Sequence, residues 1–335
     1  MSFAVSIIIP CFNEEKYIGN CIDSFFKDIN GLDIEILIVD GLSTDNTRKE
    51  IAKRQLLYPN AIKVLDNVAK KTPFALNMGI EHASGEFIMI ASAHSSFDAG
   101  YIPQILEFFK TSNADIVGGF METKVLNETA RSLSIIGVLS NKYGVGNSMF
   151  RVGVDKPTYV DTVPFGIYKT KLLKSIGGYD VRLIRNHDIE MSKRILELGH
   201  KILLVPFPKC YYYARETFSA IFQNNYRNGN WNIKTVYITK KFSSLSLRHF
   251  IPLLFVLSLV LPLALTALSP WFALLSLFSL VMYSFLVLSQ SILIKRESPK
   301  ASISNAFICF FVLHFGYGLG SINGLFSFNK LFLKP

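Results

Sequence analysis

Three short apolar runs in the N-terminal part of the chain each lead directly to side chains that can bind a small polar ligand. Asn13 and Glu14 follow the first run, and Asp40 ends the second. Ser92 and His94 follow the third run and are separated by one alanine. Carboxylate and amide oxygens can accept hydrogen bonds from a base imide or from ribose hydroxyls, and a histidine nitrogen can ligate a cation.

Helix capping is the alternative explanation for two of these polar residues. Asn13 and Asp45 could simply cap the helices that follow them. Taken singly, each would be a cap more often than a ligand. Their occurrence at adjacent strand ends favours a binding role.

The elements that must position these residues alternate along a head formed by residues 1–232. Strands are expected at residues 5–10, 34–39, 62–65 and 86–91, with helices at 14–27, after 44–46 and at 73–83. Continuous apolar strands separated by helices indicate a parallel sheet covered on both faces. Ligands bind at the carboxyl ends of the strands in such sheets, which is where the polar residues lie.

The second half of the head has a less regular pattern. Strands are expected at residues 114–120 and 201–205, the latter closed by Pro206; helices at 129–140, 188–198 and 217–231; and a glycine-rich loop at 143–157.

The last third of the chain is apolar, with Glu297 as its one acidic residue between positions 250 and 326. A helical crossing of a bilayer needs about 20 apolar residues. The expected segments are a basic juxtamembrane stretch at 233–249, transmembrane helices at 250–268, 271–294 and 303–326, and a tail at 327–335.

The charges around these spans predict their orientation. Ser269 and Pro270 leave almost no loop, so the first two spans form a hairpin. Basic residues lie before and after that hairpin, which places its two ends, and the head, in the cytosol. The third span carries four glycines suited to close packing, and it could cross the bilayer or re-enter it.

Composition excludes several other classes of protein. The net charge is +10, of which the head carries +6, without a long basic run. This suits an anionic membrane surface or a phosphorylated substrate better than a nucleic acid. The four cysteines form no Cys-x-x-Cys pair, so neither a disulfide scaffold nor structural zinc is expected. The N-terminus lacks the basic flank of a signal peptide.

Five blocks, in order along residues 5–231, carry a resemblance to a known family. They are Ile7-Ile-Ile-Pro-Cys-Phe-Asn-Glu-Glu15, Ile38-Val-Asp-Gly-Leu-Ser-Thr-Asp-Asn-Thr47, Thr72-Pro-x-x-Ala-Leu-Asn77-x-Gly79, Ala83-Ser-Gly-Glu86 and Gly177-Gly-Tyr-Asp180. They resemble family 2 inverting glycosyltransferases, and most closely the membrane-anchored group that builds bacterial exopolysaccharides such as succinoglycan. The resemblance implies an α/β, Rossmann-like head of the glycosyltransferase-A fold with a C-terminal three-helix transmembrane segment. The chain departs from the family pattern at Gly41, where a second aspartate is usual.

The resemblance also implies where a nucleotide-sugar donor binds. The residues expected to contact it are Pro10, Asn13, Glu14, Asp40, Asn77, Ser92 and Arg227.

A metal site is implied by the family but is poorly matched here. Family members place Asp-x-Asp or Asp-x-His after the fourth strand, where it holds a divalent cation against the donor diphosphate. This chain has Ser92-Ala-His94, and a serine hydroxyl is a weak replacement for an anionic ligand. His94 could ligate Mn²⁺ more readily than Mg²⁺, with Asp98 as a further candidate. The alternative is a turn without metal.

Asp188 aligns with the family's catalytic base. An inverting transfer needs one carboxylate to remove the proton of the acceptor hydroxyl. His187 precedes it and could tune or assist it. A charge that only stabilises the start of a helix is the alternative, and both roles can hold.

Three further features allow both a functional and a structural explanation. Arg227 could pair with a diphosphate, and Trp231 could stack on the acceptor sugar or lie at the lipid interface. An interfacial amphipathic helix without a ligand explains both equally well. His314 in the third span is expected to bond a neighbouring helix, and Tyr211 to Tyr213 to form a core or interfacial aromatic run.

The leading hypothesis is inverting transfer of a sugar from a nucleotide diphosphate to a membrane-held, polyprenyl-linked acceptor in bacterial surface polysaccharide assembly. The protein would be a multi-pass protein of the inner (cell) membrane with a cytoplasmic head, possible assembly partners and no nucleic acid partner. A processive synthase is one alternative. A catalytically degenerate scaffold, suggested by Ser92 and Gly41, is the other.

Overall fold

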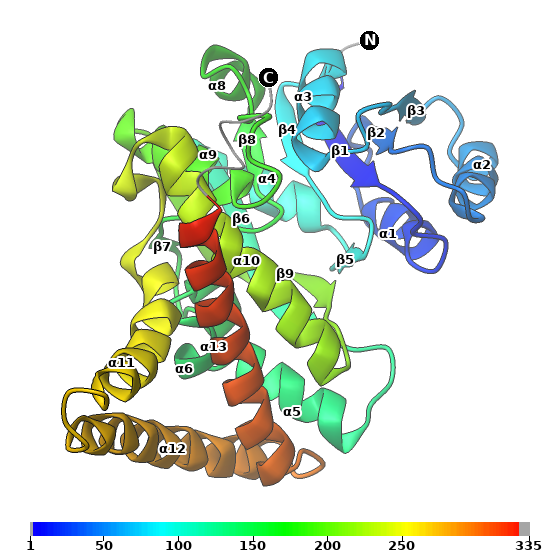
Figure 1. Ribbon diagram of the computed structural model, residues 1–335. Helices are drawn as coiled ribbons and strands as arrows, with labels where there is room; N and C mark the ends of the chain where they lie inside the picture. The colour runs from blue at the N-terminus through cyan, green and yellow to red at the C-terminus, as the bar shows by residue number, and fades with distance from the viewer. Residues whose placement is uncertain (1–2, 328–335) are drawn as a thin grey trace. The chain divides into compact units, whose positions relative to one another are not determined.

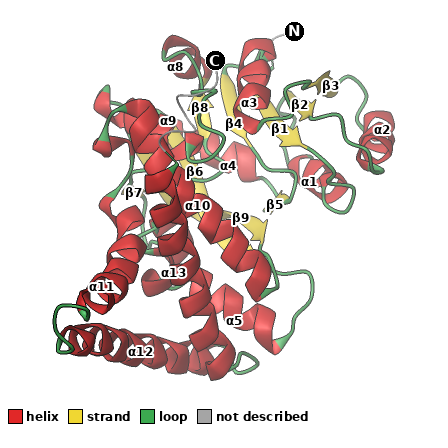
Figure 2. Cartoon of the chain, in the orientation of Figure 1, coloured by secondary structure: helices red, strands yellow, loops and turns green. Residues whose placement is uncertain are grey.

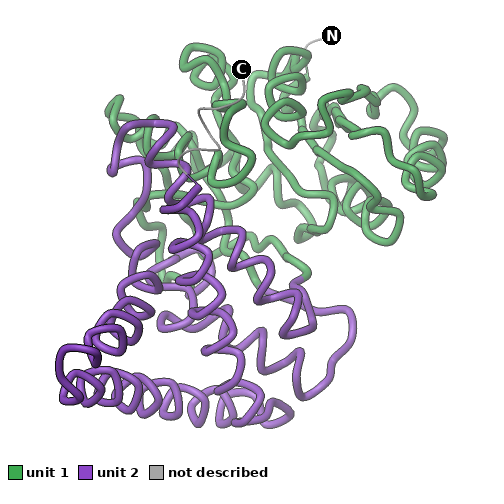
Figure 3. Tube along the Cα trace, viewed as in Figure 1, with its two compact units in different colours: residues 1–122, 153–213 green, residues 123–152, 214–335 purple. Residues whose placement is uncertain are grey.

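The computed structural model describes residues 3–327 (Figures 1 and 2). It divides into two compact units: unit 1 contains residues 1–122 and 153–213, and unit 2 contains residues 123–152 and 214–335 (Figure 3). The boundary expected at residue 232 falls inside helix α10 (Phe218–Thr239), which belongs to unit 2. Apart from Ser327, the tail expected at 327–335 lies outside the described residues.

Unit 1 is built on one sheet, to which nine strands contribute within the described residues. The strands are β1 (Val5–Cys11), β2 (Ile34–Asp40), β3 (Ile62–Asp66), β4 (Phe87–Ile90), β5 (Ser95–Phe97), β6 (Ile116–Lys124), β7 (Thr158–Tyr159), β8 (Ile167–Lys169) and β9 (Ile202–Tyr213). Their order is β3-β2-β1-β4-β8-β6-β9-β5, with β7 paired to β9. Strands β1 to β4 are parallel, and β8 runs antiparallel to β4.

The helices of unit 1 mostly follow the strands in alternation. They are α1 (Ile18–Phe25), α2 (Thr47–Leu57), α3 (Thr72–His82), α4 (Tyr101–Thr111), α8 (Thr170–Ser175) and α9 (His187–Glu197). Strand β2 is buried at every position and β1 at all but one, as expected for central strands covered on both faces. The parallel α/β arrangement predicted from the first four apolar runs is therefore confirmed.

A buried carboxylate joins the amino ends of the central strands. Glu35 on β2 has no exposed surface and accepts hydrogen bonds from Ser6 on β1 (2.7 Å) and from the Ser84 hydroxyl (2.6 Å). Its second oxygen meets Lys63 on β3 at 3.1 Å. Burial alone would raise the pKa of Glu35, but the hydrogen bonds, led by Ser84, outweigh it and lower the pKa. The ionised carboxylate therefore ties β1, β2, β3 and the segment before β4 together.

The expectation that Pro206 closes the last strand of the head is wrong. Strand β9 continues to Tyr213, because a proline removes one donor without changing the extended backbone. Leu203 and Leu204 pair with β7 before the prolines, and residues 210–212 pair with β5 after them. The strand thus bridges two partners across Pro206 and Pro208.

Unit 2 is helical in its described part. Its helices are α5 (Ala130–Leu139), α6 (Lys142–Val145), α7 (Met149–Val152), α10, the 3₁₀ turns η1 (Phe242–Ser244) and η2 (Leu247–Phe250), α11 (Ile251–Leu265), α12 (Phe272–Glu297) and α13 (Ile303–Phe326). The segment expected to be a glycine-rich loop contains the short helices α6 and α7.

Three helices in the described residues are long and apolar enough to cross a membrane. They span Leu247–Leu265, Phe272–Glu297 and Ile303–Phe326. Their most apolar windows are 17%, 11% and 39% buried, respectively, so the third is the most covered by protein. His314 on α13 bonds the Tyr283 hydroxyl of α12 at 2.8 Å, which confirms the expected helix–helix contact.

Glycines bring α13 into direct backbone contact with α10. A Cβ at Gly320 would lie 2.0 Å from the Tyr226 carbonyl oxygen, and one at Gly229 would lie 1.9 Å from that of Tyr317. Gly316 and Gly324 also face α10 at under 3 Å. We call these four glycines the glycine seam. Small residues let helix backbones approach this closely, and Ser321 adds a hydrogen bond to the Gly229 carbonyl at 3.2 Å.

We predict that Gly320→Ala destabilises the detergent-solubilised protein. The added methyl group has to push the helices apart, and overpacking of this kind costs about 1–3 kcal/mol. Each kcal/mol should lower the apparent Tm by about 2–4 °C. The control is Leu319→Ala, because Leu319 is the preceding residue and its side chain is exposed. Equal Tm values for the two variants would contradict the close packing.

Candidate active site

The loops after β1 and β2 are joined by hydrogen bonds at the carboxyl ends of these strands. Asn13, whose φ is 57°, accepts a hydrogen bond from the Thr44 backbone at 2.8 Å, and its own N–H donates to the Ser43 hydroxyl at 2.9 Å. The Glu14 backbone N–H donates to Thr47 at 2.7 Å. The cross-strand pairing of Cys11 with Asp40 sets the register. The structure thus brings the first two predicted groups together, with Asn13 exposed.

Asp40 is held from within the protein. Its carboxylate has no exposed surface and accepts hydrogen bonds from the Ser43 hydroxyl (2.5 Å), the Ser43 backbone N–H (3.1 Å) and Arg48 (2.6 Å). The Cys11 thiol adds a weaker contact at 3.6 Å; burial and the Asp40 charge raise the pKa of that thiol, so it remains a donor. Because these donors fill most of the acceptor sites, Asp40 organises the loop. Its contact with a base or ribose stays a prediction.

His94 joins the end of β4 to the end of β1. Its Nδ1 lies 3.2 Å from a carboxylate oxygen of Glu14, and its Nε2 lies 3.2 Å from the Ser92 hydroxyl. His94 and Glu14 are partly exposed, at 34% and 22% of their side chains. A carboxylate beside Nδ1 favours the tautomer with hydrogen there, which leaves the Nε2 lone pair directed at Ser92. The Glu14–His94–Ser92 chain thus connects polar side chains at the carboxyl ends of β1 and β4.

Aromatic side chains surround the His94 ring. Tyr212 meets it edge-on with ring centroids 5.3 Å apart, and Tyr17 does so at 6.3 Å. Strand β5 pairs with β9 here, with Ser95 opposite Tyr212. Of the tyrosine run 211–213, which the sequence predicts to be core or interfacial, Tyr212 thus lies against the His94 ring.

The carboxylate of Asp98 has partners within the protein, and its role as a metal ligand stays a prediction. Its two oxygens accept from the Tyr211 hydroxyl at 2.7 Å and from the Lys209 backbone at 2.8 Å. Within residues 3–327 no three His, Cys, Asp or Glu side chains form a cluster suited to a metal ion.

Asn77 links two segments of unit 1 that are about 100 residues apart in sequence. Its amide accepts a hydrogen bond from the Tyr179 N–H (2.7 Å) and donates one to the Tyr179 carbonyl (2.8 Å). Gly178, at φ 68°, has to lack a side chain because a Cβ there would lie 2.5 Å from the Asn77 oxygen. The expected donor contact of Asn77 stays a prediction, since one hydrogen and one lone pair of its amide remain.

The segment held by Asn77 leads to α9 and its acidic first turn. Arg194 of α9 donates to the carbonyls of Ile176 (2.8 Å) and Gly178 (3.0 Å), and it pairs with Glu190 (2.9 Å). Asp188 lies in the same turn as Glu190 and is exposed. One acid of the turn is therefore used internally, and the other faces solvent.

Asp188 also lies near the strand beside β4. Burial, and then the Asp188 charge, raise the pKa of Tyr168 on β8, where Tyr168 pairs with Ile88 of β4. His187 packs edge-on against Tyr179 at 5.6 Å, and its burial lowers the pKa of the imidazole. His187 is thus neutral at pH 7 and supports the helix start behind Asp188.

The remaining predicted residues occupy less constrained positions or belong to unit 2. Pro10 is half-buried on β1, opposite Val39. Arg227 is exposed on α10, and Trp231 on the same helix has the Lys234 ammonium over its ring at 5.3 Å. Both residues belong to unit 2, and their expected donor and acceptor contacts stay predictions.

The family model of glycosyl transferase family 2 matches residues 6–177, just over half of the chain. The chain belongs to this family. It is a glycosyltransferase, and its mixed sheet has the glycosyltransferase-A-like fold.

Two curated relatives are similar to this chain in sequence, and one solved structure is similar to it in fold. The dolichyl N-acetyl-alpha-D-glucosaminyl phosphate 3-beta-D-2,3-diacetamido-2,3-dideoxy-beta-D-glucuronosyltransferase of Methanococcus voltae is 31% identical over 221 residues, 64% of this chain and 68% of that protein. Succinoglycan biosynthesis protein ExoA of Rhizobium meliloti is 26% identical over 249 residues, 74% of both proteins. The mannosyltransferase PcManGT from Pyrobaculum calidifontis, solved with GDP-Man and Mn²⁺, aligns at a TM-score of 0.58 and 14% identity over 98% of this chain and 88% of its own. This last similarity shows the fold alone.

Sequence reasoning missed the arginines and the acid that hold this family 2 site. Arg48 pairs with both Asp40 and Asp66, Arg194 fastens α9 to the Gly178 loop, and Glu35 fixes the strands. Glu35 did carry a signal in the sequence, because a charged residue inside an apolar strand has to be paired if it is buried. The arginines lie on helices among other polar residues and carry no such signal.

We predict that Asn77→Ala lowers kcat about tenfold or more while leaving the KM for the donor within about twofold, because it loosens the Gly178 segment that leads to Asp188. Steady-state kinetics on the full chain would measure both constants. Asn20→Ala, an exposed asparagine on α1, is the control. A raised donor KM with unchanged kcat would instead mean that Asn77 contacts the donor.

Proposed function

We propose that this family 2 enzyme transfers a sugar, with inversion, from a nucleotide diphosphate to an acceptor held at the membrane. The observation that carries the proposal is the Glu14–His94–Ser92 chain, which joins polar groups from the carboxyl ends of β1 and β4. Parallel sheets bind their ligands at this edge. The donor would lie against these groups, with exposed Asn13 and half-buried Pro10 beside it.

Asp188 would act as the general base. It is exposed at the start of α9, whereas Glu190 in the same turn is neutralised by Arg194. An exposed carboxylate in the first helical turn can accept the proton of an acceptor hydroxyl, and the helix dipole favours a negative charge at that place. Asn77 and Arg194 act as positioning residues, because they hold the loop that leads into this helix.

His94 fits the role of a single protein ligand to a divalent cation that arrives with the donor. A metal-ligating histidine usually gives its other N–H to a carboxylate, and Glu14 occupies that place. The remaining ligands would come from the diphosphate and water, as is common for small divalent cations at phosphates. Such a cation would neutralise charge on the departing diphosphate. Glu14 would orient the imidazole, and Ser92 would bond the donor.

The acceptor is proposed to be lipid-linked, for example a polyprenyl-linked saccharide of surface polysaccharide assembly. Three apolar helices at the C-terminus support an acceptor presented at a bilayer. The names of the Methanococcus voltae and Rhizobium meliloti relatives point to a dolichyl phosphate acceptor and to exopolysaccharide synthesis, respectively. Basic residues flanking the first two spans support a cytoplasmic head in a cell membrane.

We predict that Asp188→Asn lowers transfer at least about a hundredfold without changing donor affinity, because the amide cannot accept the hydroxyl proton. Calorimetry with a panel of nucleotide sugars would identify the donor, and radiolabelled transfer to membrane lipid extracts would measure turnover. The matched control is Asp33→Asn, an exposed aspartate before β2. Equal turnover by Asp188→Asn and wild type would refute the assignment, and no heat from any donor would favour a scaffold.

We predict that Mn²⁺ binding in the presence of nucleoside diphosphate depends on His94 and Glu14. His94→Ala should abolish it, and Glu14→Gln should weaken it about 10- to 100-fold, because an outer carboxylate tunes its histidine. The electron paramagnetic resonance signal of free Mn²⁺, compared with and without protein at the same nucleoside diphosphate concentration, reports binding without any turnover. Asp98→Asn should bind as wild type does, since its oxygens have protein partners. Wild-type affinity in the His94→Ala protein would rule out this ligand.

A further inference from the structure

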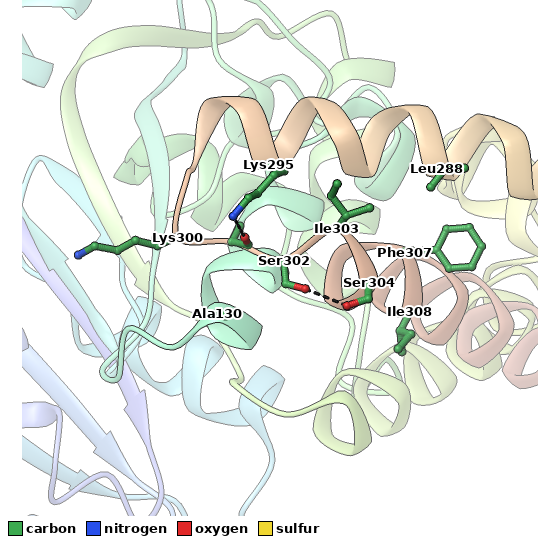
Figure 4. A pocket seen from close by; sticks show the side chains of 10 residues that line it. Ala130, Leu288, Lys295, Lys300, Ser302, Ile303, Ser304, Phe307 and Ile308 are labelled. Atoms are coloured by element: carbon green, nitrogen blue, oxygen red, sulfur yellow. Dashed lines mark hydrogen bonds between the residues drawn. The ribbon is translucent and has the colours of Figure 1, made fainter.

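A cavity of about 900 Å³ lies within unit 2, between the start of α5, the end of α12 and the start of α13 (Figure 4). Its size is in the range of about 300–1,000 Å³ that small-ligand sites have. Lys295, Lys300 and Ser302 lie toward one end of the view. Leu288 and Phe307 lie toward the other. The cavity therefore has a basic, hydroxyl-bearing end and an apolar end.

The basic end contains an ammonium held in place. Lys295 Nζ donates to the carbonyls of Pro299 (2.6 Å) and Ala301 (2.9 Å), which uses two of its three hydrogens. The third hydrogen is available to a ligand. Lys300 also lines this end and is 82% exposed; in Figure 4 its ammonium points away from the other labelled side chains, and Glu128 lies 4.0 Å from it as a weak surface partner. The basic end therefore has one ammonium held in place and a second lysine at its edge.

Two hydroxyl groups also line the cavity, those of Ser302 and Ser304. The Ser302 oxygen caps α13 by accepting from the Asn305 N–H, and it lies 2.9 Å from the Ser304 hydroxyl. Ser304 is exposed, so its hydroxyl can turn toward a bound anion. Ammonium and hydroxyl groups in this arrangement suit the oxygens of a phosphate.

The apolar end continues onto helix surfaces that a membrane would cover. Leu288 is 42% exposed on α12, and Ile308 is 44% exposed on α13. Both helices are apolar enough to span a bilayer, and Lys295 and Lys300 follow the apolar part of α12. Lysines at that position lie at the level of the lipid headgroups. The cavity thus extends from headgroup depth toward the hydrocarbon.

We infer that this cavity binds the phosphate headgroup and the upper acyl chain of an anionic bilayer phospholipid. Charge complementarity selects the phosphate, and the Leu288 side accepts the chain. Its lining contains no Asp, Glu or His, so the occupant meets no group that could deprotonate a hydroxyl. The lipid is thus a bound component and not the reacting acceptor. This inference does not depend on the transfer reaction.

The test uses native mass spectrometry of the full chain in mild detergent, titrated with dioleoylphosphatidylglycerol or dioleoylphosphatidylcholine. The variant is Lys295→Gln with Lys300→Gln. The control, Lys49→Gln with Lys171→Gln, makes the same charge change at two exposed lysines of unit 1. Each lysine near an anionic lipid contributes about fivefold in affinity, so the double variant should bind phosphatidylglycerol at least about tenfold more weakly.

A second variant tests the apolar end without changing any charge. Leu288→Ser should also weaken phosphatidylglycerol binding, while the control double variant binds as wild type does. Equal Tm values would show that the variants are folded. Wild-type phosphatidylglycerol affinity in the Lys295/Lys300 variant would overturn the proposal. Three other results would also overturn it. They are displacement of the lipid by inorganic phosphate at equal concentration, binding of phosphatidylcholine as tightly as phosphatidylglycerol, and binding of polyprenyl phosphate more tightly than phosphatidylglycerol.

Discussion

A carboxylate with no exposed surface has to be surrounded by hydrogen-bond donors, and strand β2 carries one such carboxylate at each end. Glu35 accepts hydrogen bonds from Ser6, Ser84 and Lys63, and it thereby fixes the strands on either side of β2. Asp40 accepts hydrogen bonds from Ser43 and Arg48, and it thereby fixes the loop at the carboxyl ends of the strands. Removing a partner from such a group leaves a buried charge uncompensated, which typically costs several kcal/mol. The geometry of the candidate active site rests on both networks.

The positions of Asn13 and His94 follow from that constraint. The loop held by Asp40 supplies the hydroxyl and N–H groups that fasten the Asn13 backbone and side chain. With that turn in place, Glu14 projects toward His94 from the neighbouring strand end. Elsewhere in unit 1, Asn77 and Arg194 hold the Gly178 loop and thereby the start of α9. The candidate active site is thus assembled in part by side chains that have their own partners within the protein.

Much of this arrangement could be predicted from the sequence, because local patterns set the parallel strands, the helices between them and the apolar C-terminal helices. The amide of Asn77 could not be assigned, since its partner is about 100 residues away. Asp40 is predicted to be a ligand because it ends a strand, and that prediction stands; its internal donors could not be predicted because tertiary packing sets them. Likewise, β9 passes Pro206 because two separate strands pair with its halves, which a local pattern does not reveal. The sequence of α10 is polar, so it predicts that most of this helix belongs to the head; in the structure its backbone packs against α13.

The glycine seam has a consequence for how the protein can be divided. Helix α10 precedes the apolar helices, and a soluble fragment would naturally be cut just after it. Such a fragment would retain a helix whose Gly229 face and buried Asn232, bonded to Tyr317, have lost their cover. Exposed helix backbone of this kind invites self-association of the fragment. A cut before α10, near residue 213, would remove that face, but the fragment would still contain residues 123–152, which belong to unit 2 and would lose their partners as well.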